Sequence, residues 1–296
     1  MVSIAIVGHL CIDWILFQDR IRFQIGGPTY YGGITSSKFN MNTFLVTKYG
    51  PDFPEEYMKF LKSFNLKIVK GAKGKNLTTK FKHKIKEDKR ISQLLSKCDD
   101  VEESQLDELS PEAILIDPVA QEVSFDFVKR CREKVSLLAL DPQGFLRRFY
   151  HNGYVYLNSL KEEILSLVDI IKADREELKI LGKNDFIKSL NSLSKKVKTL
   201  LITLGKEGAF LVMGDKAYKI KVPKIKLVEP IGAGDITLSS FLSSLSKGEE
   251  ALYSACLAVA CGTLSMERNF KSKIPSIKKI KEVGEELFEK VEKINL

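Results

Sequence analysis

The 296-residue chain has few cysteines and no long apolar run. Its cysteines do not form a CxxC pair, which argues against a disulfide framework and a zinc site; they are Cys11, Cys98, Cys131, Cys256 and Cys261. No apolar run reaches the ~18 residues that a membrane-spanning helix needs, so we expect no membrane association. The first residues contain neither a basic n-region nor a cleavage site. We therefore expect no signal peptide and a reducing cytoplasm as the location.

Histidine is also scarce, and positive charge is concentrated in one segment. His9, His83 and His151 lack the spacing of metal ligands, so we expect structural or exposed roles for them. The chain has 47 Lys and Arg residues against 38 Asp and Glu, and residues 67–90 contain much of the excess. Such a segment can bind nucleic acid, attract an anionic substrate or form a solvated strand. Its low aromatic content argues against nucleic acid as a partner.

Short apolar runs alternate with amphipathic segments along most of the chain, which predicts βαβ units and a parallel sheet covered on both faces. We expect strands over residues 3–7, 43–47, 113–116, 136–140, 154–157, 168–171 and 199–204, and a hairpin over 209–213 and 217–222. Helices are predicted over residues 29–40, 54–64, 125–133, 161–167, 175–181, 185–195, 235–245 and 249–266. A last helix, opened by Pro275, shows an apolar stripe from Ile277 to Val291.

Two segments, residues 15–25 and 78–95, instead alternate apolar and polar side chains. This pattern is typical of a sheet with one solvated face. We therefore predict a small β lid on an α/β body. The body would comprise residues 1–13, 26–66 and 96–296, and the lid the inserted residues 14–25 and 67–95.

The strongest chemical motif is EPIGAGD at residues 229–235, directly before a predicted helix. Its two glycines allow a tight turn, and the N–H groups of a helix start bind anions. Taken alone, Asp235 could equally be a plain N-cap.

Four further motifs stand near predicted strand ends, where open α/β sheets bind ligands. They are Gly8 with Asp13, the pair Gly26-Gly27, residues 174–177 (DREE) and residues 203–208 (TLGKEG). With GAGD, these motifs resemble those of the ribokinase-like, or PfkB-type, carbohydrate kinases. The resemblance runs over almost the whole chain. It implies a central, mostly parallel sheet with helices on both faces and a small β lid.

The resemblance also implies an activity: transfer of the γ-phosphoryl group of ATP to a hydroxyl of a sugar or polyol. Asp235 would be the base that accepts the hydroxyl proton. The N–H groups of Gly232, Ala233 and Gly234, with that of Asp235, would hold the charge on the transferred group. Glu177 would organise Mg²⁺ through water, because this ion usually keeps part of its hydration shell.

Other positions would form the two binding regions. Asp174, Thr203, Gly205 and Gly208 would belong to the ATP site. Asp13 would accept hydrogen bonds from substrate hydroxyls, and Gly26 and Gly27 would let the substrate approach the backbone. Gln143 and Arg147 would reach the substrate cleft from residues 141–147 (DPQGFLR), a segment similar to one in relatives of which some act on inositol.

Three departures from the family pattern bear on these expectations. Glu229-Pro230 replaces the usual Asp-Thr, and that Asp often helps to hold K⁺, so K⁺ is a doubtful cofactor here. Asp174 replaces the Asn of the family's NxxE motif and adds negative charge near the phosphates. Tyr30-Tyr31 stands near the place of a sugar-binding Asn and could stack on a sugar face or a base.

Several functions stay open at this point. The first is a kinase of a small polyol, with inositol possible. Tyr30-Tyr31 favours a nucleoside kinase, and the basic residues 67–90 favour a sugar-phosphate kinase. A non-catalytic regulator or nucleic-acid binder is the alternative from another class, against which Asp235 argues. The unpaired lid edge leaves both a monomer and a lid-mediated homodimer open.

Overall fold

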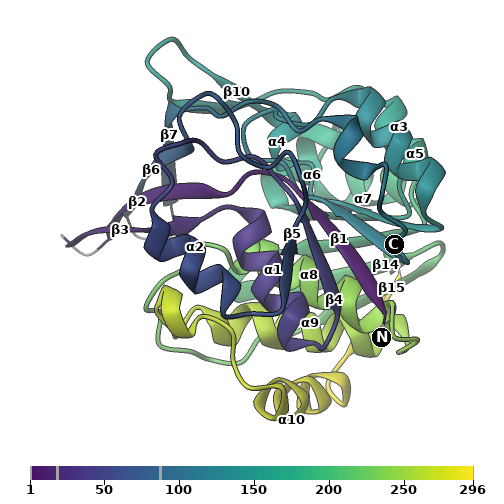
Figure 1. Ribbon diagram of the computed structural model, residues 1–296. Helices are drawn as coiled ribbons and strands as arrows, with labels where there is room; N and C mark the ends of the chain where they lie inside the picture. The colour runs from purple at the N-terminus through teal and green to yellow at the C-terminus, as the bar shows by residue number, and fades with distance from the viewer. Residues whose placement is uncertain (1, 18–19, 87–88, 296) are drawn as a thin grey trace.

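The computed structural model describes residues 2–17, 20–86 and 89–295 (Figure 1). Of the predicted lid, Gln18, Asp19, Glu87 and Asp88 lie outside the described residues. Among the helices that are described, none is both long and apolar enough to cross a membrane.

A ten-stranded sheet runs through the molecule. Its order is β16 (Glu292–Ile294), β15 (Lys216–Ile220), β14 (Ala209–Met213), β13 (Thr199–Thr203), β12 (Ile170–Asp174), β9 (Leu137–Leu140), β8 (Ala113–Ile116), β1 (Ser3–Val7), β4 (Asn42–Val46) and β5 (Leu66–Ile68). The strands from β13 to β5 are parallel, whereas β14, β15 and β16 each run antiparallel to their neighbours. Strands β1 and β8 are buried throughout, as expected for a parallel sheet covered on both faces. The predicted mostly parallel sheet is confirmed.

Helices cover both faces of this sheet (Figure 1). One face packs on α1 (Pro28–Lys38), α2 (Glu55–Lys62), α8 (Ala233–Leu245), α9 (Ala251–Ser265) and α10 (Ile277–Phe288). The other packs on α3 (Phe125–Lys134), α5 (Glu163–Leu167), α6 (Arg175–Gly182) and α7 (Phe186–Ser194). Small residues bring α8 and α9 close together: a Cβ on Gly262 would lie 2.0 Å from Thr237 Oγ1. This packing fixes α8, whose first turn faces the site described below.

A second, four-stranded sheet forms the lid. Its order is β3 (Arg20–Gly26), β2 (Cys11–Phe17), β6 (Thr79–Lys86) and β7 (Lys89–Ser96), and only the β2–β6 pair is parallel. The alternation predicted for these segments is present: Asp13 and Ile15 are buried, whereas Trp14 is exposed. The described lid strands cover residues 11–17, 20–26, 79–86 and 89–96, whereas the predicted lid segments are 14–25 and 67–95. Lys67 and Ile68 lie in β5 of the large sheet, so the predicted lid segment begins too early.

Two predicted elements differ from the structure. The strand expected at residues 154–157 does not join the parallel sheet, because β11 (Val155–Leu157) pairs antiparallel with β10 (Arg147–Phe149), directly after α4 (Gln143–Leu146). The apolar stripe expected to continue to Val291 is shorter, since α10 ends at Phe288 and the chain then enters β16. The remaining short 3-10 helices are η1 (Glu103–Leu106), η2 (Gly205–Glu207) and η3 (Phe270–Ser272).

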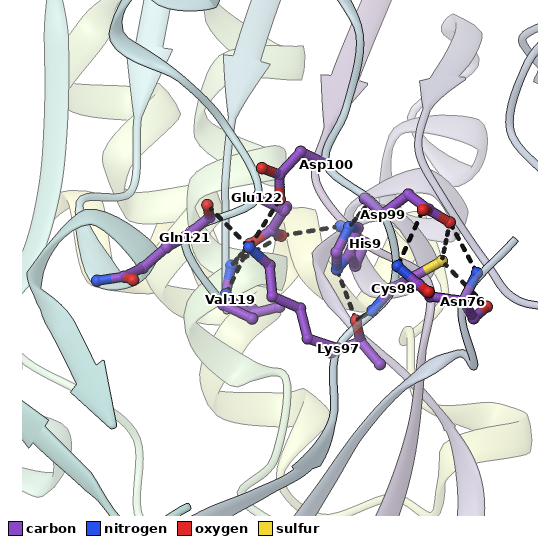
Figure 2. Close-up of polar contacts among 11 residues, drawn as sticks. His9, Asn76, Lys97, Cys98, Asp99, Asp100, Val119, Gln121 and Glu122 are labelled. Atoms are coloured by element: carbon purple, nitrogen blue, oxygen red, sulfur yellow. Dashed lines mark hydrogen bonds and ion pairs between the residues drawn. The ribbon is translucent and has the colours of Figure 1, made fainter. Parts of the chain in front are cut away.

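A buried carboxylate holds the junction at the base of the lid (Figure 2). The Glu122 side chain is fully buried and accepts hydrogen bonds from the backbone N–H groups of His9 (3.1 Å), Val119 (2.9 Å) and Ala120 (2.6 Å). The imidazole of His9 contacts the Asp99 carbonyl oxygen at 2.9 Å. Burial lowers the pKa of His9, so the ring is neutral at pH 7. These contacts tie two of the four chain crossings between body and lid, at His9 and at Asp99, to the loop after β8.

We predict that Glu122→Gln lowers the free energy of unfolding by ~2–4 kcal/mol, because an amide NH₂ group would face backbone donors and leave some of them unpaired. Urea denaturation followed by circular dichroism measures this change. Glu133→Gln is the matched control, since the Glu133 side chain is 64% exposed on α3. Equal stability of the two variants would show that the buried carboxylate does not hold the junction.

Candidate active site

Three carboxylates meet at the carboxyl edge of the large sheet. Asp117 directly follows β8, Asp141 directly follows β9, and Asp235 lies in the first turn of α8. One ligand oxygen from each lies within 4.8 Å of the others, and we call these three residues the acid cluster. Lys172 on β12 enters the cluster with its ammonium, which contacts Asp141 Oδ2 at 2.6 Å. Four separate segments thus bring strongly interacting charges to one place.

Glycine shapes the start of α8. The N-cap is Gly232, with φ of 83°, and a Cβ there would lie 2.6 Å from the Tyr31 ring. A Cβ on Gly234 would lie 2.8 Å from Lys172 Nζ. Asp235 is not the N-cap, and no side chain of the described residues caps this helix. The plain-cap interpretation of Asp235 is therefore wrong. The Ala233 N–H donates to the Pro230 carbonyl oxygen at 3.3 Å, and the other N–H groups of the first turn can face an anion.

Burial and mutual repulsion shift the acids of this region toward their protonated forms. Burial, with the charge of Asp141, raises the pKa of Asp235 to about 7, while Lys172 and Arg90 oppose the shift. Burial and Asp235 raise the pKa of Asp117 well above its ordinary value. Neither carboxyl oxygen of Asp117 has a hydrogen-bond partner among the described residues. Asp117 is therefore shifted toward its protonated form, and Asp235 is close to its midpoint at pH 7.

A small cavity of about 200 Å³ opens in front of Asp235 and beneath the lid. It is lined by these predicted site residues: Asp13, Gly27, Gln143, Arg147, Asp174, Thr203, Gly232, Ala233, Gly234 and Asp235. Asp13 is 3% exposed and lies 3.6 Å from His83 Nε2. The guanidinium of Arg147 donates to the Val119 carbonyl oxygen (3.1 Å) and lies over the Phe81 ring. The walls thus combine polar groups with two aromatic rings, Phe81 and Tyr31.

A larger cavity of about 1220 Å³ adjoins the small one. Asp174, Glu177 and Gly205 line it among the predicted residues, together with an apolar wall made of Leu204, Val222, Ile225, Leu227 and Met266. The two cavities share Arg90, Gln143, Arg147, Asp174, Pro230 and Ile231. They therefore meet beside the start of α8.

Glu177 and Asp174 form a capping box at the start of α6. The backbone N–H of Asp174 donates to Glu177 Oε2 (2.8 Å), and Asp174 Oδ1 accepts from the N–H groups of Glu176 and Glu177 (both 2.9 Å). Glu177 is only 3% exposed, and burial and the charge of Asp141 raise its pKa to about 7. These hydrogen bonds hold the side chains of Asp174 and Glu177 in the wall of the large cavity.

Two predicted site glycines line neither cavity in the described part of the chain. A Cβ on Gly26 would lie 1.9 Å from Asp13 Oδ2, so this glycine leaves room for the Asp13 carboxylate. Gly208 has φ of 106°, and a Cβ there would lie 2.1 Å from the Ile220 carbonyl oxygen. Gly208 thus shapes the turn between β13 and β14. Their direct contact with ligands remains a prediction.

Sequence reasoning missed Asp117, Asp141, Lys172, His83 and Arg90 as site residues. The two acids carried a signal, because each directly follows an apolar strand of a parallel sheet. His83 and Arg90 belong to the lid, and only the folding of β6 and β7 over the body brings them to the small cavity. Of the aromatic pair, only Tyr31 lines this cavity; Tyr30 is buried, and its hydroxyl donates to the Phe270 carbonyl oxygen.

Known proteins resemble this chain in sequence and in fold. The family profile described as "pfkB family carbohydrate kinase" matches residues 1–270. A cytidine kinase of Thermococcus kodakarensis is 27% identical over 84% of this chain and 90% of its own length. A pyrophosphate-dependent kinase of the ribokinase family, solved with sulfate, matches with a TM-score of 0.83 and 25% identity over 95% of this chain and all of that one. A structure of such a kinase with a pyrophosphate analog and myo-inositol matches with a TM-score of 0.80 and 25% identity over 92% and 98% of the two chains.

We predict that Asp235→Asn raises the free energy of unfolding at pH 8 by ~2 kcal/mol. A carboxyl whose pKa is raised on folding binds its proton more tightly in the native state. The free energy of unfolding therefore declines as pH rises from the ordinary pKa of aspartate, 3.8, to the folded-state pKa of about 7. The gain should therefore shrink as pH falls and be largely lost at about pH 3, below the pKa of the carboxyl in both states. Urea denaturation at the two pH values measures it. Asp215→Asn, on the exposed turn after β14, is the control, and an identical response of both variants would contradict the raised pKa.

Proposed function

Because the chain belongs to the PfkB family of carbohydrate kinases and is a phosphotransferase acting on a hydroxyl group, we propose that it transfers the γ-phosphoryl group of ATP to a small polyol. The observation that carries this proposal is the meeting of two cavities at the start of α8. One cavity would hold the acceptor and the other the donor. The transferred group would then pass beside Asp235.

The size and lining of the large cavity support ATP as the donor. Its volume of about 1220 Å³ accommodates a nucleotide, and its apolar wall, including Val222, Leu227 and Met266, suits a base. Pyrophosphate, the donor of the structurally similar kinase, has no apolar part that could use this wall. Pyrophosphate is therefore the second donor to test.

The start of α8 would act as an anion hole during transfer. As the acceptor oxygen bonds to the γ-phosphorus, the bond from phosphorus to the bridging oxygen of ADP breaks. The N–H groups of Gly232, Ala233 and Gly234 would stabilise the charge on the equatorial oxygens. Asp235 would accept the hydroxyl proton, and the shared cations Arg90 and Arg147 would attract the phosphates.

The carboxylates of Asp174 and Glu177 would hold Mg²⁺ at the large cavity. Oxygen ligands suit this ion, and the capping box keeps both side chains in place without consuming all of their oxygens. When bound, Mg²⁺ would neutralise charge on the donor phosphates.

The small cavity favours a compact, hydroxyl-rich acceptor. Its volume of about 200 Å³ is below the usual 300–1,000 Å³ of sites for drug-sized ligands, so it suits a single polyol ring. Asp13, Gln143 and His83 offer hydrogen bonds to hydroxyl groups. Inositol fits this chemistry, and a related structure contains myo-inositol.

A nucleoside is the second candidate acceptor, because the cytidine kinase matches most of this chain and the Tyr31 ring lines the small cavity. A sugar phosphate has less support. Within the described part of the basic segment 67–90, only Arg90 contributes a cation to the cavities, whereas Lys80 pairs with Asp52 at 2.6 Å.

An acceptor panel tests the proposal directly. With Mg²⁺, we expect turnover of ATP with inositol or another unphosphorylated polyol, and little turnover with pyrophosphate, because only ATP uses the apolar wall. Phosphorylated acceptor is identified by mass spectrometry. A preference for sugar phosphates would overturn the proposed acceptor class, and faster turnover with pyrophosphate would overturn the proposed donor.

Asp235→Asn should fold and bind ATP but lose about 10³-fold in kcat, because the amide cannot accept the proton. In the wild type, kcat/KM should decline as pH falls below about 7, since protonated Asp235 is inactive. Steady-state kinetics and ATP titration calorimetry measure these effects, with Asp215→Asn as the control. An active Asp235→Asn enzyme would exclude Asp235 as the base.

A further inference from the structure

A fully buried lysine lies behind the anion hole. Lys273 directly follows η3, and its side chain is 0% exposed. Its Nζ donates to the main-chain carbonyl oxygen of Glu229 at 2.5 Å and lies 3.8 Å from Glu229 Oε1. Burial lowers the pKa of Lys273 to about 8, although Glu229 opposes the shift. The side chain is therefore mostly charged at pH 7 and faces two oxygens of one residue.

Glu229 connects this lysine to the loop that enters α8. Only Pro230 and Ile231 separate Glu229 from the N-cap Gly232. The backbone N–H of Glu229 donates to the Met266 carbonyl oxygen (2.9 Å). Both main-chain polar groups of Glu229 are thus held, the N–H by the Met266 carbonyl oxygen and the carbonyl oxygen by the Lys273 ammonium.

The same glutamate also contacts the lid. Gln24 on β3 donates to Glu229 Oε1 at 2.8 Å, and Arg22 Nη1 lies 3.7 Å from Oε2. The Gln24 amide also donates to the Tyr31 hydroxyl (3.1 Å), beside Gly232. The lid, the loop before α8 and the body therefore meet at Glu229. The buried ammonium of Lys273, which belongs to the body, compensates the negative charge of the Glu229 carboxylate.

These contacts do not fit an alkali-metal site at Glu229. A dehydrated K⁺ would need carbonyl and carboxylate oxygens that face a common point. Here the main-chain oxygen and Oε1 of Glu229 both already face Lys273 Nζ. An ion at this position would also meet the repulsion of a fixed ammonium.

We propose that the Lys273 ammonium serves as a built-in cation that positions the loop before the anion hole, so that phosphoryl transfer needs no alkali-metal ion. Lys273 is a positioning residue, because it acts through Glu229 and Gly232. The proposal rests on the proposed transfer at the start of α8. It predicts that removal of the side chain creates a requirement for a small cation.

Thermal unfolding tests whether the Lys273 ammonium takes the place of an alkali-metal ion, without any assay of turnover. At equal ionic strength, the wild type should unfold at the same temperature in potassium and in tetramethylammonium chloride. Lys273→Ala should unfold at a lower temperature and be partly restored by K⁺ or NH₄⁺ alone, since tetramethylammonium is too large for the vacated space. Lys279→Ala, whose lysine is 52% exposed on α10, is the control. A wild type stabilised specifically by K⁺, or an Ala variant indifferent to all cations, would overturn the proposal.

Kinetics then test the positioning role. Lys273→Ala should lose at least about tenfold in kcat with little change in the affinity for ATP, and K⁺ or NH₄⁺ should restore part of kcat. If this variant does not fold, the double variant Lys273→Met with Glu229→Gln removes both buried charges and should fold with low, cation-independent kcat. Full kcat in either variant, or K⁺ activation of the wild type, would overturn the proposal. Absence of turnover in the wild type with every acceptor would instead refute the proposed function and leave the unfolding result standing.

Discussion

The contact between Lys172 and Asp141 beneath the start of α8 is the interaction on which the site depends. Two like charges 4.8 Å apart repel each other by about 3 kcal/mol at an effective dielectric constant near 20, so three ionised acids within that distance could not persist together. The cluster lowers this repulsion in two ways: Lys172 supplies a positive charge, and the raised pKa of Asp117 favours its protonated form. Asp235 is then left with a pKa near neutrality, which suits a proton acceptor.

The fold explains why these groups meet. Parallel strands β8, β9 and β12 end at one edge of the sheet. Asp117 and Asp141 directly follow the first two strands, and Lys172 lies within the third. The close packing of α8 on α9 places the start of α8 at the same edge. The lid closes the opposite side with Asp13, His83 and Arg90, and Glu122 and Glu229 fix it to the body. In the proposed mechanism, stability and catalysis therefore oppose each other locally, because the buried acids that would take part in the chemistry weaken the fold.

Periodicity in the sequence predicted the central strands well, and β1 and β8 have the predicted bounds, because a fully buried strand leaves an uninterrupted apolar run. It failed for β10 and β16, which are three residues long and depend on their partners rather than on their own pattern. The GAGD motif located Asp235, since the glycines are required by local geometry. Lys172 and Lys273 could not be foreseen, because a buried lysine is distinguished from an exposed one only by partners distant in sequence.

The most direct test of this account is a pH titration of the Asp235 carboxyl carbon by ¹³C NMR in the wild type and in Lys172→Met. We predict a wild-type pKa near 7 for Asp235, and a higher pKa in Lys172→Met because the ammonium that favours the carboxylate is lost. An Asp235 that titrates in the ordinary range of an exposed aspartate, or that does not respond to Lys172→Met, would contradict the account.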